Sequence, residues 1–174
     1  MIMALNDPVG HTQKTLSVVG LVGMAVTVGS AVGFQVIGGY IPCKLCYEQR
    51  IPYYIGLPIL ALAVILSFRR GPALVTRLLI LAGALLMIWA LYLGVYHSGV
   101  EWGWWAGPTD CGVAVDATSG TSGGVLDSLN SVIPPSCDKA ALRVLGLSFA
   151  GWQAICAAIL AIIMLRGAFA RSRA

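Results

Sequence analysis

Residues 78–96 read LLILAGALLMIWALYLGVY, a stretch of 19 residues without a charged side chain. Three further charge-free apolar windows cover residues 16–37, 51–68 and 145–165. About 20 helical residues cross the hydrocarbon core of a bilayer, so each window is long enough to span it. The sequence therefore predicts an all-α membrane protein that forms a bundle of four transmembrane helices.

The composition of the whole chain agrees with this prediction. The 174 residues are 58% hydrophobic and only 10% charged, with a mean hydropathy of +0.85. A soluble domain is about 25% charged, and so few charges would leave most of the surface of a soluble globule apolar. We therefore exclude a water-soluble fold, expect the lipid bilayer to solvate the protein, and interpret residues 1–174 as a single integral membrane domain.

The basic residues predict how the chain is oriented. Short segments on the cytoplasmic side of a membrane protein are enriched in Lys and Arg. Most of the basic residues lie in the two termini and the middle connection, namely Lys14, Arg69, Arg70, Arg77, Arg166, Arg171 and Arg173. Both termini are then cytoplasmic, and the connections 38–50 and 97–144 face the periplasm, the second as a long loop. Because the net charge of +4 is a topology signal, we expect no nucleic-acid partner.

Four of the five cysteines fall in the two exterior connections: Cys43, Cys46, Cys111 and Cys137. The exterior of a bacterial inner membrane is oxidising, so thiols there pair and stay paired. Cys156 lies in the middle of the fourth window, where a thiol behaves as a small buried hydrophobic group. The cysteines therefore place the expected chemistry on the periplasmic face.

Cys43 and Cys46 form a C-x-x-C unit, whose small disulfide ring exchanges electrons readily. Pro42 suits the first position of a helix, so this unit is expected to form the opening turn of the second helix. Backbone N–H groups and the helix dipole would stabilise a thiolate there. Arg50 lies four residues after Cys46 and seven after Cys43, so the three side chains share one face of the helix. A guanidinium there can stabilise a negative charge that forms during the reaction.

Other interpretations of these residues stay open. A zinc site needs two further Cys or His ligands beside the C-x-x-C unit, and we expect no metal. A c-type haem is excluded because Tyr47 stands where the motif requires His. Arg50 alone could be a topology or snorkelling residue. A disulfide between Cys111 and Cys137 could staple a flexible loop or exchange with a partner protein.

His97 ends the third window at the level expected for Arg50. A single His at a helix end is often an interface or capping residue, and its depth also makes it a candidate site residue. Glu101, four residues further on, could pair with it, although a solvated carboxylate at the rim is the favoured interpretation.

Residues 43–53 read CKLCYEQRIPY and resemble the C-x-L-C-x-x-Q-R-x-P-Y signature of the DsbB family of disulfide bond formation proteins. The similarity continues in YHSGVE at 96–101 and in GPTDC at 107–111. It extends to Cys137 and to the sequence LGLS at 145–148, and covers residues from about 16 to 165. The resemblance implies an inner-membrane enzyme that reoxidises a periplasmic DsbA-like thioredoxin-fold protein. Its electrons would pass to the membrane quinone pool, as ubiquinone or menaquinone.

The resemblance also implies roles for the cysteines. Cys111 would form the mixed disulfide with the partner, and Cys137 would resolve it. Cys43 would exchange with this loop pair, and Cys46 would be the thiolate that faces the quinone ring.

Three further residues would form the quinone pocket by the same resemblance. Arg50 would bind a quinone oxygen, and Gln49 and His97 would line the pocket. Two rival functions are retained: an oxidoreductase similar to vitamin K epoxide reductase, and a metal-binding or structural four-helix membrane protein.

Overall fold

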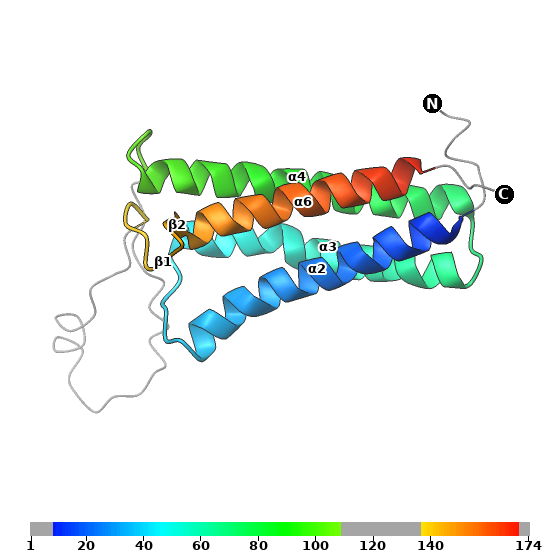
Figure 1. The fold of residues 1–174 in the computed structure, drawn as a ribbon, viewed down its shortest axis with the longest axis horizontal. Coiled ribbons are helices and arrows are strands. Elements are labelled where there is room, and N and C mark those ends of the chain that lie inside the picture. Colours follow the sequence, from blue (N-terminus) through cyan, green and yellow to red (C-terminus); the bar gives the residue numbers. More distant parts are fainter. Residues whose placement is uncertain (1–8, 109–136, 171–174) are drawn as a thin grey trace.

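The computed structural model describes residues 9–108 and 137–170, and their fold is a bundle of four long helices (Figure 1). All four are long and apolar enough to cross a membrane, which confirms that prediction. The helices are α2 (His11–Val36), α3 (Lys44–Phe68), α4 (Ala73–Glu101) and α6 (Phe149–Phe169). A two-residue ladder, β1 (Arg143–Val144) with β2 (Leu147–Ser148), precedes α6.

All four helices extend beyond the charge-free windows that predicted them. The largest extension at one end is at α3, which begins at Lys44, so the expected connection 38–50 is helical over its last seven residues. Pro42 precedes the N-cap residue Cys43 and does not occupy the first helical position. At its C-terminal end α4 continues past residue 96 to Glu101. Charged and polar side chains are accepted in these turns because they lie at the ends of the bundle.

The fourth window, residues 145–165, predicted the start of the last helix wrongly. Residues 145–148 do not begin the helix but form the turn and second strand of a tight hairpin. Leu145 and Gly146 have φ values of 54° and 82°, the left-handed pair that a two-residue hairpin turn requires. Ser148 then caps α6, because its side chain accepts a hydrogen bond from the backbone N–H of Gly151.

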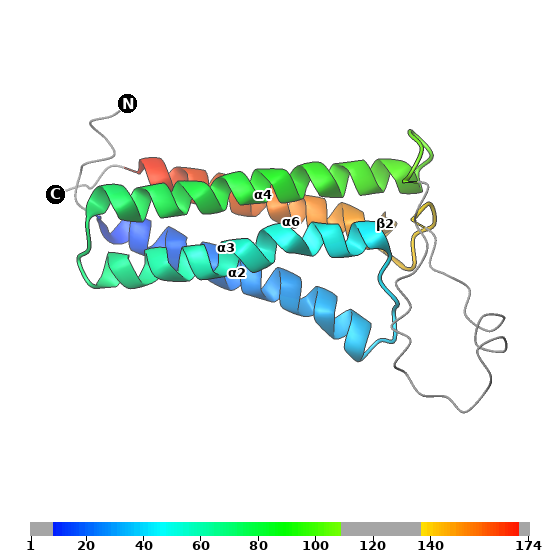
Figure 2. The same ribbon diagram turned by 180° about the vertical axis from the view of Figure 1, so that it is seen from behind.

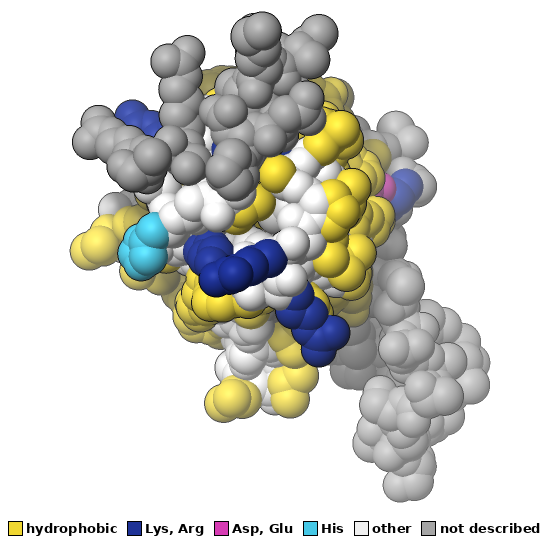
Figure 3. All heavy atoms as spheres, turned by 90° about the vertical axis from the view of Figure 1, so that its right-hand side faces the viewer, with side chains coloured by type: hydrophobic (Ala, Val, Ile, Leu, Met, Phe, Trp, Pro, Cys, Tyr) yellow, Lys and Arg dark blue, Asp and Glu magenta, His cyan; other side chains and the backbone are white. Residues whose placement is uncertain are grey.

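The helices are arranged so that α2 diverges from the other three. Figures 1 and 2 show α3, α4 and α6 running together, while α2 leaves them toward the end that carries the hairpin. The start of α2 and the end of α6 lie at the opposite end, where Lys and Arg side chains gather (Figure 3). The bundle therefore has a basic end and an end at which its helices separate.

Buried polar side chains close the basic end. Arg77 is fully buried in α4 and donates hydrogen bonds to the carbonyl oxygens of Ala168 and Ala170, at 3.0 and 2.9 Å. The Gln13 side chain of α2 donates to the same Ala170 carbonyl. Carbonyl groups at a helix C-terminus have no partner within the helix, so these contacts satisfy the end of α6 and join three helices.

Helices α4 and α6 approach each other closely at Gly94. A Cβ atom added at Gly94 would lie 2.9 Å from the Cβ and 3.1 Å from the Cα of Ala154. Small residues allow helix backbones to approach closely, and in lipid this packing replaces much of the missing hydrophobic driving force. Gly94 therefore sets the spacing between the C-terminal part of α4 and the N-terminal part of α6.

We expect Gly94→Ala to lower the free energy of unfolding by about 1–3 kcal/mol, because the methyl group meets the Ala154 backbone and separates the helices. Gly29→Ala is the matched control, since a Cβ there meets no atom within 4 Å. The control should not lose stability, since Ala is the better helix former. Unfolding midpoints of both variants in the same detergent test this, and equal midpoints would contradict the packing argument.

Candidate functional site

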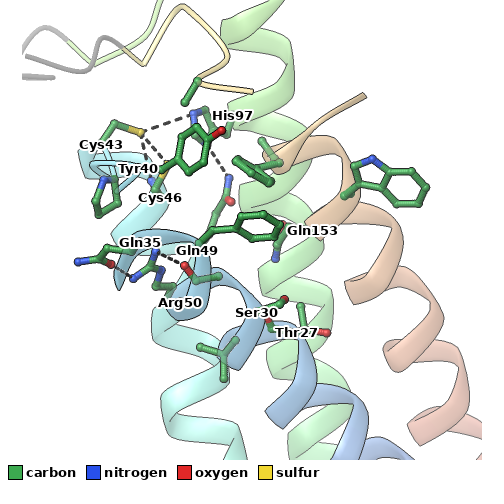
Figure 4. Close-up of a pocket in the computed structure, with 18 of the residues that line it drawn as sticks. Thr27, Ser30, Gln35, Tyr40, Cys43, Cys46, Gln49, Arg50, His97 and Gln153 are labelled. Carbon is green, nitrogen blue, oxygen red and sulfur yellow. Dashed lines mark hydrogen bonds between the residues drawn. The ribbon is translucent and has the colours of Figure 1, made fainter. Parts of the chain in front are cut away.

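The C-x-x-C unit forms the start of α3. Cys43 is the N-cap residue, and its sulfur accepts a hydrogen bond from the backbone N–H of Cys46 at 3.4 Å. The two sulfur atoms lie 3.0 Å apart, and both cysteines are free thiols (Figure 4). This confirms that the pair occupies the opening turn of a membrane helix, where the amide groups point toward the sulfur.

His97 approaches this pair from the last turns of α4. Its Nε2 lies 3.7 Å from the Cys43 sulfur, and its Nδ1 lies 2.8 Å from the side-chain nitrogen of Gln49. The same Gln49 nitrogen is 3.3 Å from the carbonyl oxygen of Leu93. His97 and Gln49 are both buried, and these two predicted residues form one contact network with the C-x-x-C unit through the Cys43 sulfur.

The surroundings stabilise a thiolate at Cys43. The hydrogen bond from the Cys46 side chain lowers the pKa of the Cys43 thiol to about 4, and His97 adds to the effect while burial opposes it. A thiol without such partners has a pKa of roughly 8.5. Because the thiolate is the reactive form of a cysteine in thiol exchange, this lowered pKa supports Cys43 as a candidate reactive sulfur.

Arg50 lies one turn beyond Cys46 and bridges α3 to α2. Its Nη1 donates to the side-chain oxygen of Gln35 at 2.5 Å, and its Nη2 donates to the carbonyl oxygen of Ala31 at 3.2 Å. The guanidinium also lies over the ring of Tyr47, 5.4 Å from its centre. Arg50 is 9% exposed, so it does not reach out to water as a snorkelling residue would.

Glu101 differs from the favoured expectation of a solvated rim carboxylate. Its side chain is only 5% exposed, because α4 continues one turn past His97 and the chain then folds back. Its Oε1 lies 3.8 Å from the Nε2 of His97, and its Oε2 has no hydrogen-bond partner among residues 9–108 and 137–170. Glu101 is therefore a buried acidic neighbour of the site.

A cavity of about 740 Å³ adjoins these residues, where α2 diverges from the bundle. Cys43, Cys46 and Arg50 line it together with apolar side chains of α2 and α6. Aromatic rings form part of its wall, with the centres of Phe34 and Phe149 4.8 Å apart. Pockets for small organic ligands have this volume and this mixture of apolar wall and few polar groups.

The remaining cysteines have different positions. Cys137 is buried in an apolar cluster with Cys43, Leu45 and Val100, and it is disulfide-bonded. Cys111, its expected partner, lies outside the described residues. Cys156 is a free thiol that lines the cavity and is half-buried, so it is less enclosed than a structural core thiol was expected to be.

The site also meets one requirement for a metal. The ligand atoms of Cys43, Cys46 and His97 lie within 4.8 Å of one another. Two thiolates and an imidazole are ligands that zinc accepts, and a closed tetrahedral site needs a fourth. In the part of the chain that the structure describes, this group contains no fourth Cys, His, Asp or Glu.

The sequence interpretation missed two polar residues around the cavity, Gln35 and Gln153. Gln35 positions Arg50, and the Gln153 side chain of α6 donates hydrogen bonds to the Tyr53 hydroxyl and to the carbonyl oxygen of Ala90. Gln35 and Gln153 lie inside charge-free apolar windows. Polar side chains within membrane spans are costly and often functional, so this signal was available in the sequence.

The arrangement is thus a reduced C-x-x-C pair at a helix start, beside a histidine and a buried arginine, on the wall of a large apolar cavity. The family model for the disulfide bond formation protein DsbB matches residues 13–166, most of the chain. Comparison with curated proteins and with solved structures found no match. The family resemblance in the sequence is thereby confirmed, and the chain belongs to the DsbB family of disulfide bond formation proteins.

Proposed function

We propose that this protein is a quinone-dependent thiol:disulfide oxidoreductase. It reoxidises a DsbA-like thioredoxin-fold protein, passes the electrons to membrane quinone, and so sustains disulfide formation in exported proteins. The observation that carries this proposal is the Cys43–Cys46 pair, which has a stabilised thiolate and lies on the wall of the apolar cavity beside Arg50. Thiol exchange and electron transfer then occur at one end of one helix.

The proposed location is a bacterial inner membrane, with the C-x-x-C end in the periplasm and both termini in the cytoplasm. The gathering of Lys and Arg at the opposite end of the bundle supports this orientation through the positive-inside rule (Figure 3). The oxidising periplasm is also the compartment in which a disulfide carrier operates.

The exchange sequence starts at the long exterior loop. A thiolate of the reduced partner attacks the Cys111–Cys137 disulfide at Cys111, forming a mixed disulfide and releasing Cys137 as a thiolate. The second thiol of the partner then attacks this mixed disulfide, which leaves the partner oxidised and Cys111 and Cys137 reduced. The pair Cys111 and Cys137 carries away two electrons, and the partner thiols lose two protons to solvent.

The second exchange moves these electrons to α3. The Cys137 thiolate attacks the Cys43 sulfur of the Cys43–Cys46 disulfide, and Cys46 leaves as a thiolate. Cys111 then releases Cys43 by re-forming the disulfide with Cys137. The burial of Cys137 in one apolar cluster with Cys43 supports Cys43 as the attacked atom. The departing Cys46 sulfur lies one helical turn before Arg50, whose positive charge stabilises it.

The residues around the cavity fit a quinone. Its ring is apolar in its faces and carries two oxygen atoms, so it suits apolar walls with hydrogen-bond donors at one end. Arg50 supplies such donors, and Gln49 and His97 line the same cavity. Quinone supplies two-electron oxidising chemistry, while the protein holds the ring beside the sulfur and stabilises the negative charge that forms on oxygen.

A metal-binding function is the second candidate, because three ligand atoms converge at Cys43, Cys46 and His97. Metal analysis and thiol counting on the purified protein separate the two functions. About one zinc per chain, released together with the thiols of Cys43 and Cys46, would support the metal function and contradict the oxidase.

We expect Cys46→Ser to abolish quinone reduction by a reduced thioredoxin-fold partner, because the electron-donating sulfur is lost. The partner should still form a mixed disulfide with the loop cysteines, since that step precedes Cys46. Quinone absorbance and non-reducing electrophoresis measure the two steps separately. Normal quinone reduction by the variant would contradict the assignment.

We expect Arg50→Ala to raise the apparent KM for quinone about 10-fold to 100-fold, because one hydrogen bond from a charged donor is lost. Arg69→Ala is the matched control, because Arg69 is exposed at the other end of the same helix. The assay is quinone reduction at varied quinone concentration in detergent. An unchanged KM in Arg50→Ala would return this residue to a topology role.

The thiolate at Cys43 should persist to acidic pH in the reduced protein. Because the pKa of Cys43 is lowered to about 4, its thiolate is present above that pH and is lost as the pH falls through it. In Cys46→Ala the principal cause of the lowering is removed, so the transition should move to higher pH. Ultraviolet thiolate absorbance during an acid titration measures both, and coincident transitions would contradict the stated cause.

A further inference from the structure

Gln49 lies behind His97, on the side of the ring that faces away from the cysteines. Its side-chain nitrogen contacts two atoms at once, the Nδ1 of His97 at 2.8 Å (Figure 4) and the carbonyl oxygen of Leu93 at 3.3 Å. The role suggested by family resemblance was only to line the pocket. These two contacts indicate a more specific role.

The Leu93 contact fixes which end of the Gln49 amide faces the ring. A carbonyl oxygen only accepts hydrogen bonds, so the group facing Leu93 must be the amide NH₂ and not the amide oxygen. That NH₂ group has two hydrogen atoms, and the second points at Nδ1 of His97. Nδ1 must therefore accept, which means that it carries no proton.

The position of the His97 proton follows from this. A neutral imidazole with an unprotonated Nδ1 has its proton on Nε2. Nε2 is the nitrogen that lies 3.7 Å from the Cys43 sulfur and 3.8 Å from the Glu101 carboxylate. Turning the ring over would place carbon atoms at both contacts and lose them.

We propose that Gln49 is a positioning residue that holds the proton of His97 on Nε2, so that His97 acts as a fixed hydrogen-bond donor toward the Cys43 sulfur. His97 then stabilises the thiolate but does not take the proton of the thiol, because the nitrogen that faces the sulfur already carries one. This inference deepens the proposed function, and rests on it only for the identity of Cys43 as a reacting sulfur.

The charged and titratable groups around His97 are compatible with this assignment. Cys43 and Cys46 approach from the start of α3, and Glu101 approaches from the next turn of α4. Arg50 and Lys139 line the same cavity. The anionic groups, a thiolate and a carboxylate, both lie on the Nε2 side, where an N–H donor is favourable.

The same proton position argues against zinc. A histidine that binds a metal through Nε2 needs that nitrogen unprotonated and usually donates its Nδ1–H to an acceptor. Gln49 presents a donor to Nδ1 and so favours the opposite tautomer. The tautomer thus separates a thiol-reaction site from a metal site before any activity is measured.

The experiment is ¹⁵N NMR of the full-length, reduced protein in detergent with ¹⁵N-labelled histidine. The chain has two histidines, so a His11→Gln background leaves His97 alone in the spectrum. At neutral pH we expect an unprotonated Nδ1 and a protonated Nε2. A protonated Nδ1 in this protein would overturn the proposal.

Two substitutions test the cause. Gln49→Glu replaces the donor by an acceptor, so both ring nitrogens should carry protons at the same pH. Gln49→Met keeps the approximate shape but removes the donor to Nδ1, so the ¹⁵N chemical shift of Nδ1 should move. An unchanged Nδ1 shift in Gln49→Met, or the tautomer of the parent protein in Gln49→Glu, would show that Gln49 does not hold the proton.

Gln35→Ala is the matched control, because this glutamine lines the same cavity but bonds to Arg50 and not to His97. It should leave the ¹⁵N pattern unchanged, and a changed pattern would contradict the specific role of Gln49. A parent protein with the expected tautomer but no thiol-dependent quinone reduction would overturn the proposed function and leave the role of Gln49 standing.

Discussion

A polar side chain inside an apolar bundle must find its hydrogen-bond partner within the protein, because lipid offers none. In this protein that constraint also joins the helices. Gln49 connects α3 to α4, Arg50 connects α3 to α2, Gln153 connects α6 to its neighbours, and Arg77 connects α4 to α6. Each of these contacts holds two elements in one register, and three of them border the cavity. The polar side chains around the candidate site therefore also hold together the helices that form the cavity wall.

The helix α2 illustrates the balance between these contacts and apolar packing. Near the basic end it packs against the core through Met24, whereas beyond Val28 it diverges and meets the bundle through Arg50. Phe34 reaches across to Phe149 at the same level. The cavity therefore exists because few side chains hold this end of α2 against α3 and α6. An apolar ligand can bind inside a helix bundle only where the side chains leave such a cavity between the helices.

The fold could be predicted from the sequence because lipid imposes one strong rule, a run of about 20 apolar residues for each span. The boundaries were less predictable, since windows without charge end where the first charged residue stands, whereas helices end where backbone groups find caps. Lys44 to Arg50 therefore lies in a helix although it contains three charged side chains. The turn at Leu145 and Gly146 was missed because an apolar window shows no sign of positive φ at a leucine.

The site was predictable where residues are close in sequence. Cys43, Cys46 and Arg50 share a helix face by spacing alone, the expected depth of His97 made it a candidate, and family resemblance added Gln49. Contacts between helices followed from neither, so Gln35 and the buried state of Glu101 came only from the structure. Glu101 was misjudged because its exposure depends on how the chain folds back after α4, which no local pattern determines.

The N-cap of α3 is a cysteine, so the redox state of Cys43 bears on the hydrogen bonding of the first helical turn. In the proposed cycle Cys43 would both react and cap the helix, since its sulfur accepts a hydrogen bond from the backbone N–H of Cys46. A negatively charged sulfur is a stronger acceptor than one held in a disulfide. Oxidation of the pair would therefore weaken the first capping bond of α3, and reduction would restore it. Amide hydrogen exchange at Cys46 would then report the redox state of the pair directly.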